Sequence, residues 1–249
     1  MHAHSVTRRF SSAMLGLFLA FPAMHASERD KKPDLTPLMS AAANGDLEAV
    51  HQLIAKGADV HQRTRKGETA LYEAIDRRNP DKDNLPIVEA LLTAGANANE
   101  VEVFDTSALV VSLTREYGNP EVTLLLIRSG ARVPLSCGDG DSVVALATMS
   151  SSIEVLQALL GVGAPANCAG VHGQTALHWA ALNAEVQRVE VLLEYGANPS
   201  QRDSEGRTPL DVVMTTNPDP IIQGLFEKTR ELLIAAAQKA ADAESLPAR

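Results

Sequence analysis

Residues 173–200 read GQTALHWAALNAEVQRVEVLLEYGANPS, and the spacing within this stretch indicates the fold of most of the chain. Its apolar residues recur at three- and four-residue intervals in two short segments, which predicts two helices. The apolar residues of the first segment are Leu177, Ala180 and Ala181, and those of the second are Val186, Val189, Leu192 and Leu193. Gly196 follows the second segment, where a left-handed glycine commonly ends a helix. Neither short helix can bury its apolar face alone.

The same arrangement recurs along the chain. A Thr or Ser opens each copy, at positions 36, 69, 107, 142, 175 and 208, so the intervals are 33, 38, 35, 33 and 33 residues. A Gly-Ala pair ends each of the first five copies. The opening Thr or Ser is a suitable N-cap for the first helix of its copy. Stacking of neighbouring copies would bury both apolar faces, which explains why the arrangement repeats.

The motifs TALHWAA at 175–181 and VEVLLEYGAN at 189–198 resemble the ankyrin repeat, and the resemblance covers roughly residues 35–240. It implies an all-α solenoid of about six helix-turn-helix units with short β-hairpin fingers. The fingers would lie at 59–68, 97–106, 132–141, 165–174 and 198–207. The resemblance also implies an internal hydrogen bond between Thr175 and His178 at the start of a first helix.

Three segments depart from the repeat. Extra residues lie between the two helices of the second unit, near 78–86, and of the third, at Asn119-Pro120; we expect local loops there rather than a broken stack. The sixth unit lacks the Gly-Ala ending and continues into an Ala-rich segment near 221–240. This segment should be a C-terminal capping helix, with residues 241–249 as a flexible tail.

The composition narrows the classes of function. The chain has 249 residues, 45% of them hydrophobic but only 4% aromatic, which suits a core of Leu, Val, Ile and Ala in helices. The formal net charge is −9, and Lys and Arg are not concentrated in any block. Nucleic acid and anionic membrane surfaces are therefore poor partners.

The N-terminal residues 1–26 read as a signal peptide. Arg8 and Arg9 precede the apolar run 10–21, and small residues follow up to Ala26, near which cleavage is expected. A buried core helix is the alternative, and a partial twin-arginine pattern leaves the export route open. Cleavage would leave a short linker at 27–34 and change the net charge from −9 to −11. We expect a periplasmic or secreted protein without a membrane-inserted segment.

No catalytic motif stands out. The sequence contains no G-x-S-x-G, phosphate-binding loop or H-E-x-x-H, so we expect no enzyme activity and no cofactor or metal. Two Asp-rich stretches, 138–142 and 81–84, superficially resemble calcium loops but lack the later Gly and Glu of such loops. Trp179, the only Trp, is either packed in the core or a contact for a partner.

Cys137 and Cys168 are the only cysteines, and they lie in consecutive predicted fingers. In an oxidising compartment such a pair often forms a disulfide. Cys137 lies five residues before Ser142 and Cys168 lies seven residues before Thr175, so their positions within the repeat differ by two residues. Both a disulfide and two free thiols therefore stay open.

In ankyrin proteins the usual binding site is the concave face, made of finger tips and exposed positions of first helices. We locate the corresponding positions in this chain by counting from the start of each unit. They are Arg65, Lys66, Glu68, Asp76 and Arg77 in the second unit; Val103, Phe104 and Arg115 in the third; Asp139, Asp141 and Met149 in the fourth; Val171, His172, Gln174, Leu182 and Asn183 in the fifth; and Ser204, Glu205 and Arg207 in the sixth.

The resemblance extends to exported ankyrin-repeat proteins of Gram-negative bacteria. It implies a monomer that binds another protein, with its acidic charge favouring a basic partner surface. Two roles fit: an inhibitor or immunity protein for a secreted toxin or cell-wall enzyme, or a scaffold for a periplasmic enzyme. A secreted effector that binds eukaryotic proteins is the alternative.

Overall fold

The computed structural model describes residues 34–76, 83–99, 107–114, 119–134, 137, 142–150, 152–170, 172–213 and 219–244. The chain divides into two units, Met1–Leu35 and Thr36–Arg249. Of the first unit only Asp34 and Leu35 are described, so the predicted signal peptide lies outside the described residues. The fold below is that of the second unit.

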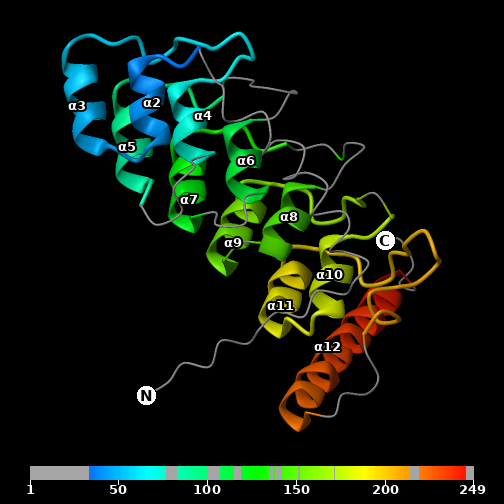
Figure 1. Cartoon of the computed structure of the whole chain (residues 1–249). Helices are drawn as coiled ribbons and strands as arrows, with labels where there is room; N and C mark the ends of the chain where they lie inside the picture. The colour runs from blue at the N-terminus through cyan, green and yellow to red at the C-terminus, as the bar shows by residue number, and fades with distance from the viewer. Residues whose placement is uncertain are drawn as a thin grey trace. The chain divides into compact units, whose positions relative to one another are not determined.

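Five helix pairs and one long helix make up the described part of the second unit (Figure 1). The first helices of the pairs are α2 (Pro37–Ala43), α4 (Ala70–Ile75), α6 (Ala108–Thr114), α8 (Val143–Ser150) and α10 (Ala176–Leu182). The second helices are α3 (Leu47–Ala55), α5 (Leu85–Thr93), α7 (Pro120–Arg128), α9 (Ile153–Gly161) and α11 (Val186–Glu194). The long helix is α12 (Pro220–Glu244).

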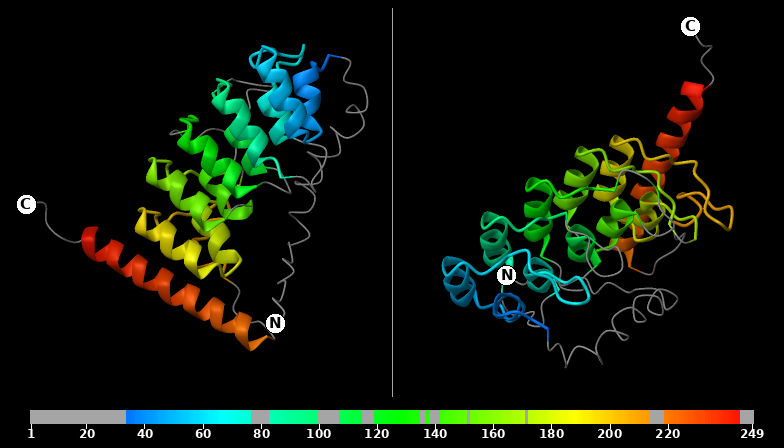
Figure 2. Two further views of the ribbon diagram at one scale, coloured as in Figure 1. Left: turned by 90° about the vertical axis from the view of Figure 1, so that its left-hand side faces the viewer. Right: turned by 90° about the horizontal axis from the view of Figure 1, so that it is seen from above.

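The pairs stack in two parallel rows. Each first helix contacts the next first helix, from α2 to α10, and each second helix contacts the next second helix, from α3 to α11. The two views of Figure 2 show these rows side by side, with α12 at the end of the stack. Because α12 contacts both α10 and α11, it covers the end of both rows, as predicted for a C-terminal cap.

Side-chain caps fix where the first helices begin. The hydroxyl oxygens of Thr36 and Thr69 accept hydrogen bonds from the backbone N–H three residues later at 3.2 Å. Ser107 and Ser142 do the same at 3.4 and 3.1 Å. The predicted N-caps are therefore confirmed at these four starts, and Thr175 is the N-cap of α10 in a capping box with His178.

A glycine ends each second helix in the left-handed conformation, as predicted. Gly57, Gly95, Gly130, Gly163 and Gly196 have φ angles from +81° to +97°. The Ala after each of them donates its N–H to the carbonyl five residues back, for example Ala197 to Leu192 at 2.9 Å. This bond closes the helix end and turns the chain out of the stack.

The core consists of Leu, Val and Ala from both rows, with Leu91, Leu126, Leu159 and Leu192 all completely buried at equivalent positions. In the third unit, the core also contains a pair of polar residues, Ser112 and Thr123. Thr123 donates its hydroxyl to Ser112 Oγ at 3.0 Å, and Ser112 donates to the Leu109 carbonyl at 2.7 Å. Both side chains are buried, so the Thr123 hydroxyl depends on Ser112 as its acceptor, and Ser112 depends on the Leu109 carbonyl.

The stack continues through the two predicted insertions. Residues 77–82 and 115–118 lie outside the described part, but α4, α5, α6 and α7 on either side keep their contacts. Asn119 Nδ2 donates to Asp83 Oδ1 at 3.1 Å, which links a residue of one predicted insertion to a residue of the other.

The structure assigns no β-strand to the described residues, so the expected β-hairpins are not shown there, and most of the fingers 97–106 and 132–141 lies outside the described part. The C-terminal part of the fold needs correction. The capping helix α12 continues to Glu244, beyond the predicted end at residue 240, because Ala241 and Ala243 have high helix propensity. In the sixth unit, residues 209–213 form turns instead of a first helix.

Candidate interaction face

The fingers, which lead from the end of a second helix to the start of the next first helix, are described most completely in three places. The second unit is preceded by the turn Thr64–Glu68, in which Thr64 N–H donates to the Glu68 carbonyl and Gly67 N–H to the Thr64 carbonyl, both at 2.9 Å. Residues 170–174 and 203–207 form the same two bonds. These three turns present their middle residues at their tips.

The turn Asp203–Arg207 is closed by its own charged residues. Asp203 Oδ1 accepts the backbone N–H groups of Glu205 and Arg207 at 2.9 Å, and its Oδ2 accepts Nε and Nη2 of Arg207 at 3.0 and 2.9 Å. Burial raises the pKa of the Asp203 carboxyl, but the hydrogen bonds from Arg207 and Glu205 outweigh it and hold the pKa at about 2. The Arg207 side chain is therefore engaged within its own finger, with Glu205 as a second partner at 2.9 Å.

The last two fingers interlock. Ser204 N–H donates to the His172 carbonyl at 3.0 Å. Gly173 has a φ of +68°, and a Cβ there would lie 2.8 Å from the backbone nitrogen of Ser204. Only glycine allows this approach, so these two fingers form one rigid pair.

His178 joins a first helix to the following finger. Its Nδ1 accepts the backbone N–H of Thr175 at 3.1 Å, so Nε2 carries the proton and donates to the Arg207 carbonyl at 3.0 Å. Burial lowers the pKa of His178 below its ordinary value, although the Arg207 carbonyl and the Asp203 charge oppose this. The hydrogen bond implied between Thr175 and His178 is present at 2.9 Å, and the histidine is a structural residue here.

Asparagine side chains tie successive fingers together at their bases. Asn99 Nδ2 donates to the Gly130 carbonyl at 2.9 Å and its Oδ1 accepts the Arg132 N–H at 2.6 Å. Asn167 makes the same two bonds to Gly196 and Asn198, at 2.9 and 2.7 Å. Sequence reasoning missed this role, although Asn stands four residues after the Gly in both units.

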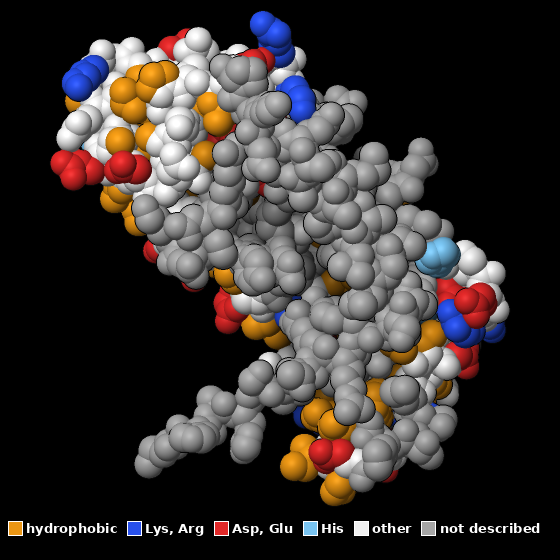
Figure 3. Space-filling view, in the orientation of Figure 1, with side chains coloured by type: hydrophobic (Ala, Val, Ile, Leu, Met, Phe, Trp, Pro, Cys, Tyr) orange, Lys and Arg blue, Asp and Glu red, His pale blue; other side chains and the backbone are white. Residues whose placement is uncertain are grey.

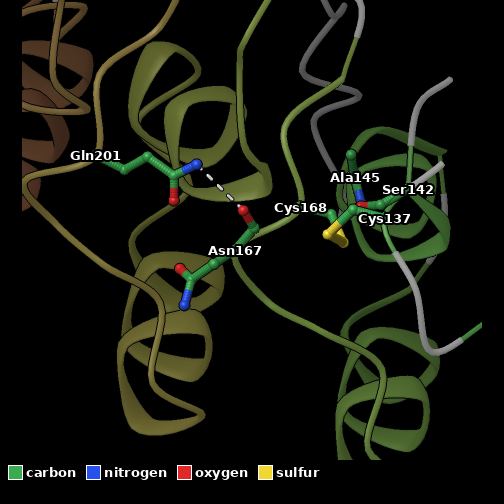
Figure 4. Close-up of a disulfide and its surroundings, with 6 residues drawn as sticks. All are labelled: Cys137, Ser142, Ala145, Asn167, Cys168 and Gln201. Carbon is green, nitrogen blue, oxygen red and sulfur yellow. Dashed lines mark hydrogen bonds between the residues drawn. A yellow bond between two sulfur atoms is a disulfide. The ribbon is translucent and has the colours of Figure 1, made fainter. Parts of the chain in front are cut away.

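A disulfide joins Cys137 and Cys168, whose Cα atoms lie 5.1 Å apart (Figure 4). Cys168 is buried and Cys137 is exposed. The offset of two residues along the repeat is compatible with the bond, because both cysteines fall within the reach of a disulfide. Figure 4 also shows Asn167 beside Cys168, with the Asn167 carbonyl accepting from Gln201 Nε2 at 3.1 Å.

The predicted contact residues fall into four groups. Arg65, Lys66, His172, Asn183, Ser204 and Glu205 are exposed, and Met149, Gln174, Leu182 and Arg207 are partly buried. Arg77, Val103, Phe104, Arg115, Asp139, Asp141 and Val171 lie outside the described residues. Figure 3 shows an exposed histidine beside acidic and basic side chains at the end of the unit that carries α10 and α12.

Two of the predicted contact residues are buried instead. Glu68 is 6% exposed, and its Oε2 accepts the Thr64 hydroxyl at 3.0 Å within the finger turn. Asp76 is 9% exposed at the end of α4. The repeat phase gave the right finger or helix for both residues, but it could not show that Asp76 is buried or that Glu68 turns inward to the Thr64 hydroxyl.

Trp179 is partly buried on α10, and its indole nitrogen has no hydrogen-bond partner among the described residues. Within the same residues, no group of three or more His, Cys, Asp or Glu side chains lies together as metal ligands would. Most of the two Asp-rich stretches weighed as calcium loops lies outside the described part. None of the described helices has the length and apolarity needed to cross a membrane.

A family model described as "Ankyrin repeats (3 copies)" matches residues 11–102, 108–203 and 144–236. The chain therefore belongs to the ankyrin-repeat family, as the motifs predicted. Ankyrin repeats form interaction modules that bind proteins, and the fold in general is a non-catalytic scaffold.

Two solved structures resemble the chain over most of its length. An ankyrin repeat domain from Acinetobacter baumannii is 25% identical with a TM-score of 0.64, covering 80% of this chain and 97% of that one. A chain from the complex of a predatory endopeptidase of Bdellovibrio bacteriovorus with an immunity protein is 25% identical with a TM-score of 0.61, covering 81% of this chain and 98% of that one.

Curated relatives are much longer proteins. The mitochondrial disaggregase of Homo sapiens is 31% identical over 223 residues, which is 84% of this chain and 28% of that protein. The Bos taurus disaggregase is 30% identical over 203 residues, 81% of this chain and 24% of that protein. The chain thus spans about a quarter of the length of these relatives.

Proposed function

We propose that this chain is an exported protein-binding module that acts as an inhibitor or immunity protein for a partner enzyme, without catalysis of its own. The observation that carries the proposal is the similarity, over 98% of the other chain's length, to a chain of an endopeptidase–immunity protein complex. A match over nearly a whole chain supports a helical stack of comparable length.

Two features of the chain support export, and a third supports the binding of a partner. The N-terminal residues have the order of charged, apolar and small residues of a signal peptide. The Cys137–Cys168 disulfide fits an oxidising compartment such as the periplasm. The formal charge of −9 suits a basic partner surface and would speed its association.

The interaction face would consist of the finger tips and the ends of the first helices. The interlocked fingers 170–174 and 203–207 present His172, Ser204 and Glu205 on a rigid support, and Asn183 is exposed at the end of α10. A rigid surface loses little conformational entropy when it binds, which favours affinity. The module is proposed to be a monomer in the absence of its partner.

Affinity capture tests the proposal. The full chain with a C-terminal tag is expressed in a Gram-negative host, the periplasm is isolated, and captured proteins are identified by mass spectrometry. We expect the tagged protein in the periplasm, shortened near Ala26, together with one stoichiometric partner. Recovery from the cytoplasm at full length would contradict export, and recovery from the medium would favour the secreted effector.

A matched pair of variants tests the face. His172→Asp with Asn183→Arg changes two exposed residues of the proposed face. His51→Asp with Gln187→Arg makes the same kind of change at exposed positions of the second-helix row. We expect the first pair to weaken capture at least about tenfold and the second to leave it unchanged. Equal capture by both would refute the assignment of the face.

A further inference from the structure

We propose that the Cys137–Cys168 disulfide is a redox-sensitive clamp on the interaction face. When the bond is formed, it holds the end of the third unit to the finger 165–174; when it is reduced, this junction loosens and partner binding weakens. The effect on binding rests on the proposed function, whereas the clamp itself is a property of the chain alone.

At two other junctions, an asparagine side chain links the neighbouring units. At the junction of the second and third units, the Asn99 side chain bonds to the Gly130 carbonyl and the Arg132 N–H. At the junction of the fourth and fifth units, Asn167 bonds to the Gly196 carbonyl and the Asn198 N–H. Each Asn stands four residues after the glycine of its unit and reaches the residue two after the next glycine.

The junction of the third and fourth units cannot make these bonds. Pro134 stands four residues after Gly130, where the Asn would be, and Pro165 stands two residues after Gly163, where the N–H donor would be. A proline side chain has no amide, and a proline nitrogen has no hydrogen to donate. Both partners of the hydrogen-bonded link are therefore missing at this junction.

The disulfide lies at the same junction. Cys137 is three residues after Pro134 and Cys168 is one residue after Asn167, and the bond brings their Cα atoms to 5.1 Å. A covalent link thus stands where the hydrogen-bonded link is absent. Cys168 is next to Asn167, which is bonded onward to Asn198 and Gln201 (Figure 4), so the clamp is continuous with the last two units.

The two sulfurs differ in access. Cys137 is exposed, whereas Cys168 is 2% exposed. A thiolate of a dithiol reductant would attack Cys137 Sγ, break the S–S bond and release Cys168 as a thiolate, which takes up a proton. The second thiol of the reductant then attacks the mixed disulfide and releases Cys137 as a thiol. The chain gains two electrons and two protons, and the reductant is oxidised to its disulfide.

Amide hydrogen exchange tests the clamp without a partner. The N–H groups of Gly170, Gly173 and Ser204 close or join the fingers next to the disulfide, and those of Val50 and Val88 lie in α3 and α5. Dithiothreitol should raise exchange at the first three at least about tenfold and leave the last two unchanged. The Cys137→Ser, Cys168→Ser chain should match the reduced protein and not respond to dithiothreitol.

Two results would overturn the clamp. One is unchanged exchange at Gly170, Gly173 and Ser204 on reduction. The other is an equal rise at Val50 and Val88, which would make the disulfide a general support of the stack.

The capture experiment tests the effect on binding. The double serine chain should retain the partner at least about tenfold less well than the wild-type chain. Equal retention would overturn the regulatory part and leave the proposed function intact. If neither chain captures a protein, the proposed function fails, and the exchange measurement still decides whether the clamp exists.

Discussion

The backbone N–H of Thr175 donates to Nδ1 of His178 at 3.1 Å, and this bond sets the tautomer of the histidine. Nε2 must then carry the proton that bonds the Arg207 carbonyl in the next finger. The neutral imidazole therefore connects the start of α10 to the last finger, and a second proton on the ring would remove the acceptor that Thr175 needs.

Stability should accordingly fall in mild acid. Burial lowers the pKa of His178 in the folded protein below 6.5, so the unfolded chain binds the proton first as the pH drops. Above pH 6.5, His178 is neutral in both states and does not lower the free energy of unfolding; below pH 6.5, its protonation in the unfolded chain lowers that free energy. Urea unfolding at pH 7.5 and 5.5 should show a larger loss for the wild-type chain than for His178→Ala. An equal loss in both would show that His178 does not contribute.

The Asp203 carboxylate should stabilise the last finger. Asp203→Ala leaves the N–H groups of Glu205 and Arg207 without their acceptor and breaks the ion pair, which should cost about 1–3 kcal/mol of unfolding free energy. Asp59→Ala is the control, because that exposed carboxylate accepts a backbone N–H only from His61. Urea unfolding at pH 7 compares them, and a smaller loss for Asp203→Ala than for the control would refute the role.

The contribution of Asp203 to the stability of the folded protein should persist to low pH. Its pKa is lowered from 3.8 to about 2, so the stabilisation is fully present above pH 3.8 and is lost only as the pH falls through about 2. NMR of the carboxyl carbon should place the midpoint of its titration near 2. A midpoint at or above 3.8 would contradict the hydrogen-bonded arrangement.

The repeat could be predicted from the sequence because its signals are local. The N-caps at Thr36 and Thr69 and the left-handed glycine at Gly196 depend on residues within one helical turn. The stacking followed because each helix has a single apolar face to bury. These features set the register of the units and the positions of the fingers.

The details of the face depend on side-chain contacts within and between the fingers, which the spacing of the repeat does not encode. The inward turn of Glu68 to Thr64 and the engagement of Arg207 by Asp203 each follow from packing inside a finger. The Cys137–Cys168 disulfide depends on two residues in consecutive fingers that are out of step along the repeat. Sequence reasoning could therefore indicate the right fingers without showing which side chains stay exposed.

The buried hydroxyl pair of the third unit allows a double-mutant test. Ser112→Ala alone removes the acceptor of the buried Thr123 hydroxyl and should cost about 1–3 kcal/mol. Adding Thr123→Val replaces the second hydroxyl by a methyl group and should recover part of that loss. Urea unfolding of both single variants and the double variant gives the coupling energy. Strict additivity would show that the two hydroxyls act independently.

Alanine substitutions at two glycines distinguish the cost of backbone strain from the cost of a steric clash. Gly173 and Gly206 both have positive φ angles, of +68° and +78°, so Ala at either should cost about 1–2 kcal/mol. Only at Gly173 would the added Cβ approach Ser204 N, at 2.8 Å; nothing lies within 4 Å at Gly206. Gly173→Ala should therefore destabilise more and speed exchange of the Ser204 amide. Equal effects of the two changes would contradict the interlocked fingers.

The most direct test of the account places a photo-cross-linking amino acid at one position of the full chain in the producing cell. His172 lies on the proposed interaction face and His51 is exposed on α3, so the two positions form a matched pair. We expect the probe at 172 to cross-link to one partner protein in the periplasm and the probe at 51 not to do so. Cross-linking of the same protein from position 51 but not from 172 would contradict it, as would no cross-link from 172 while a partner is captured.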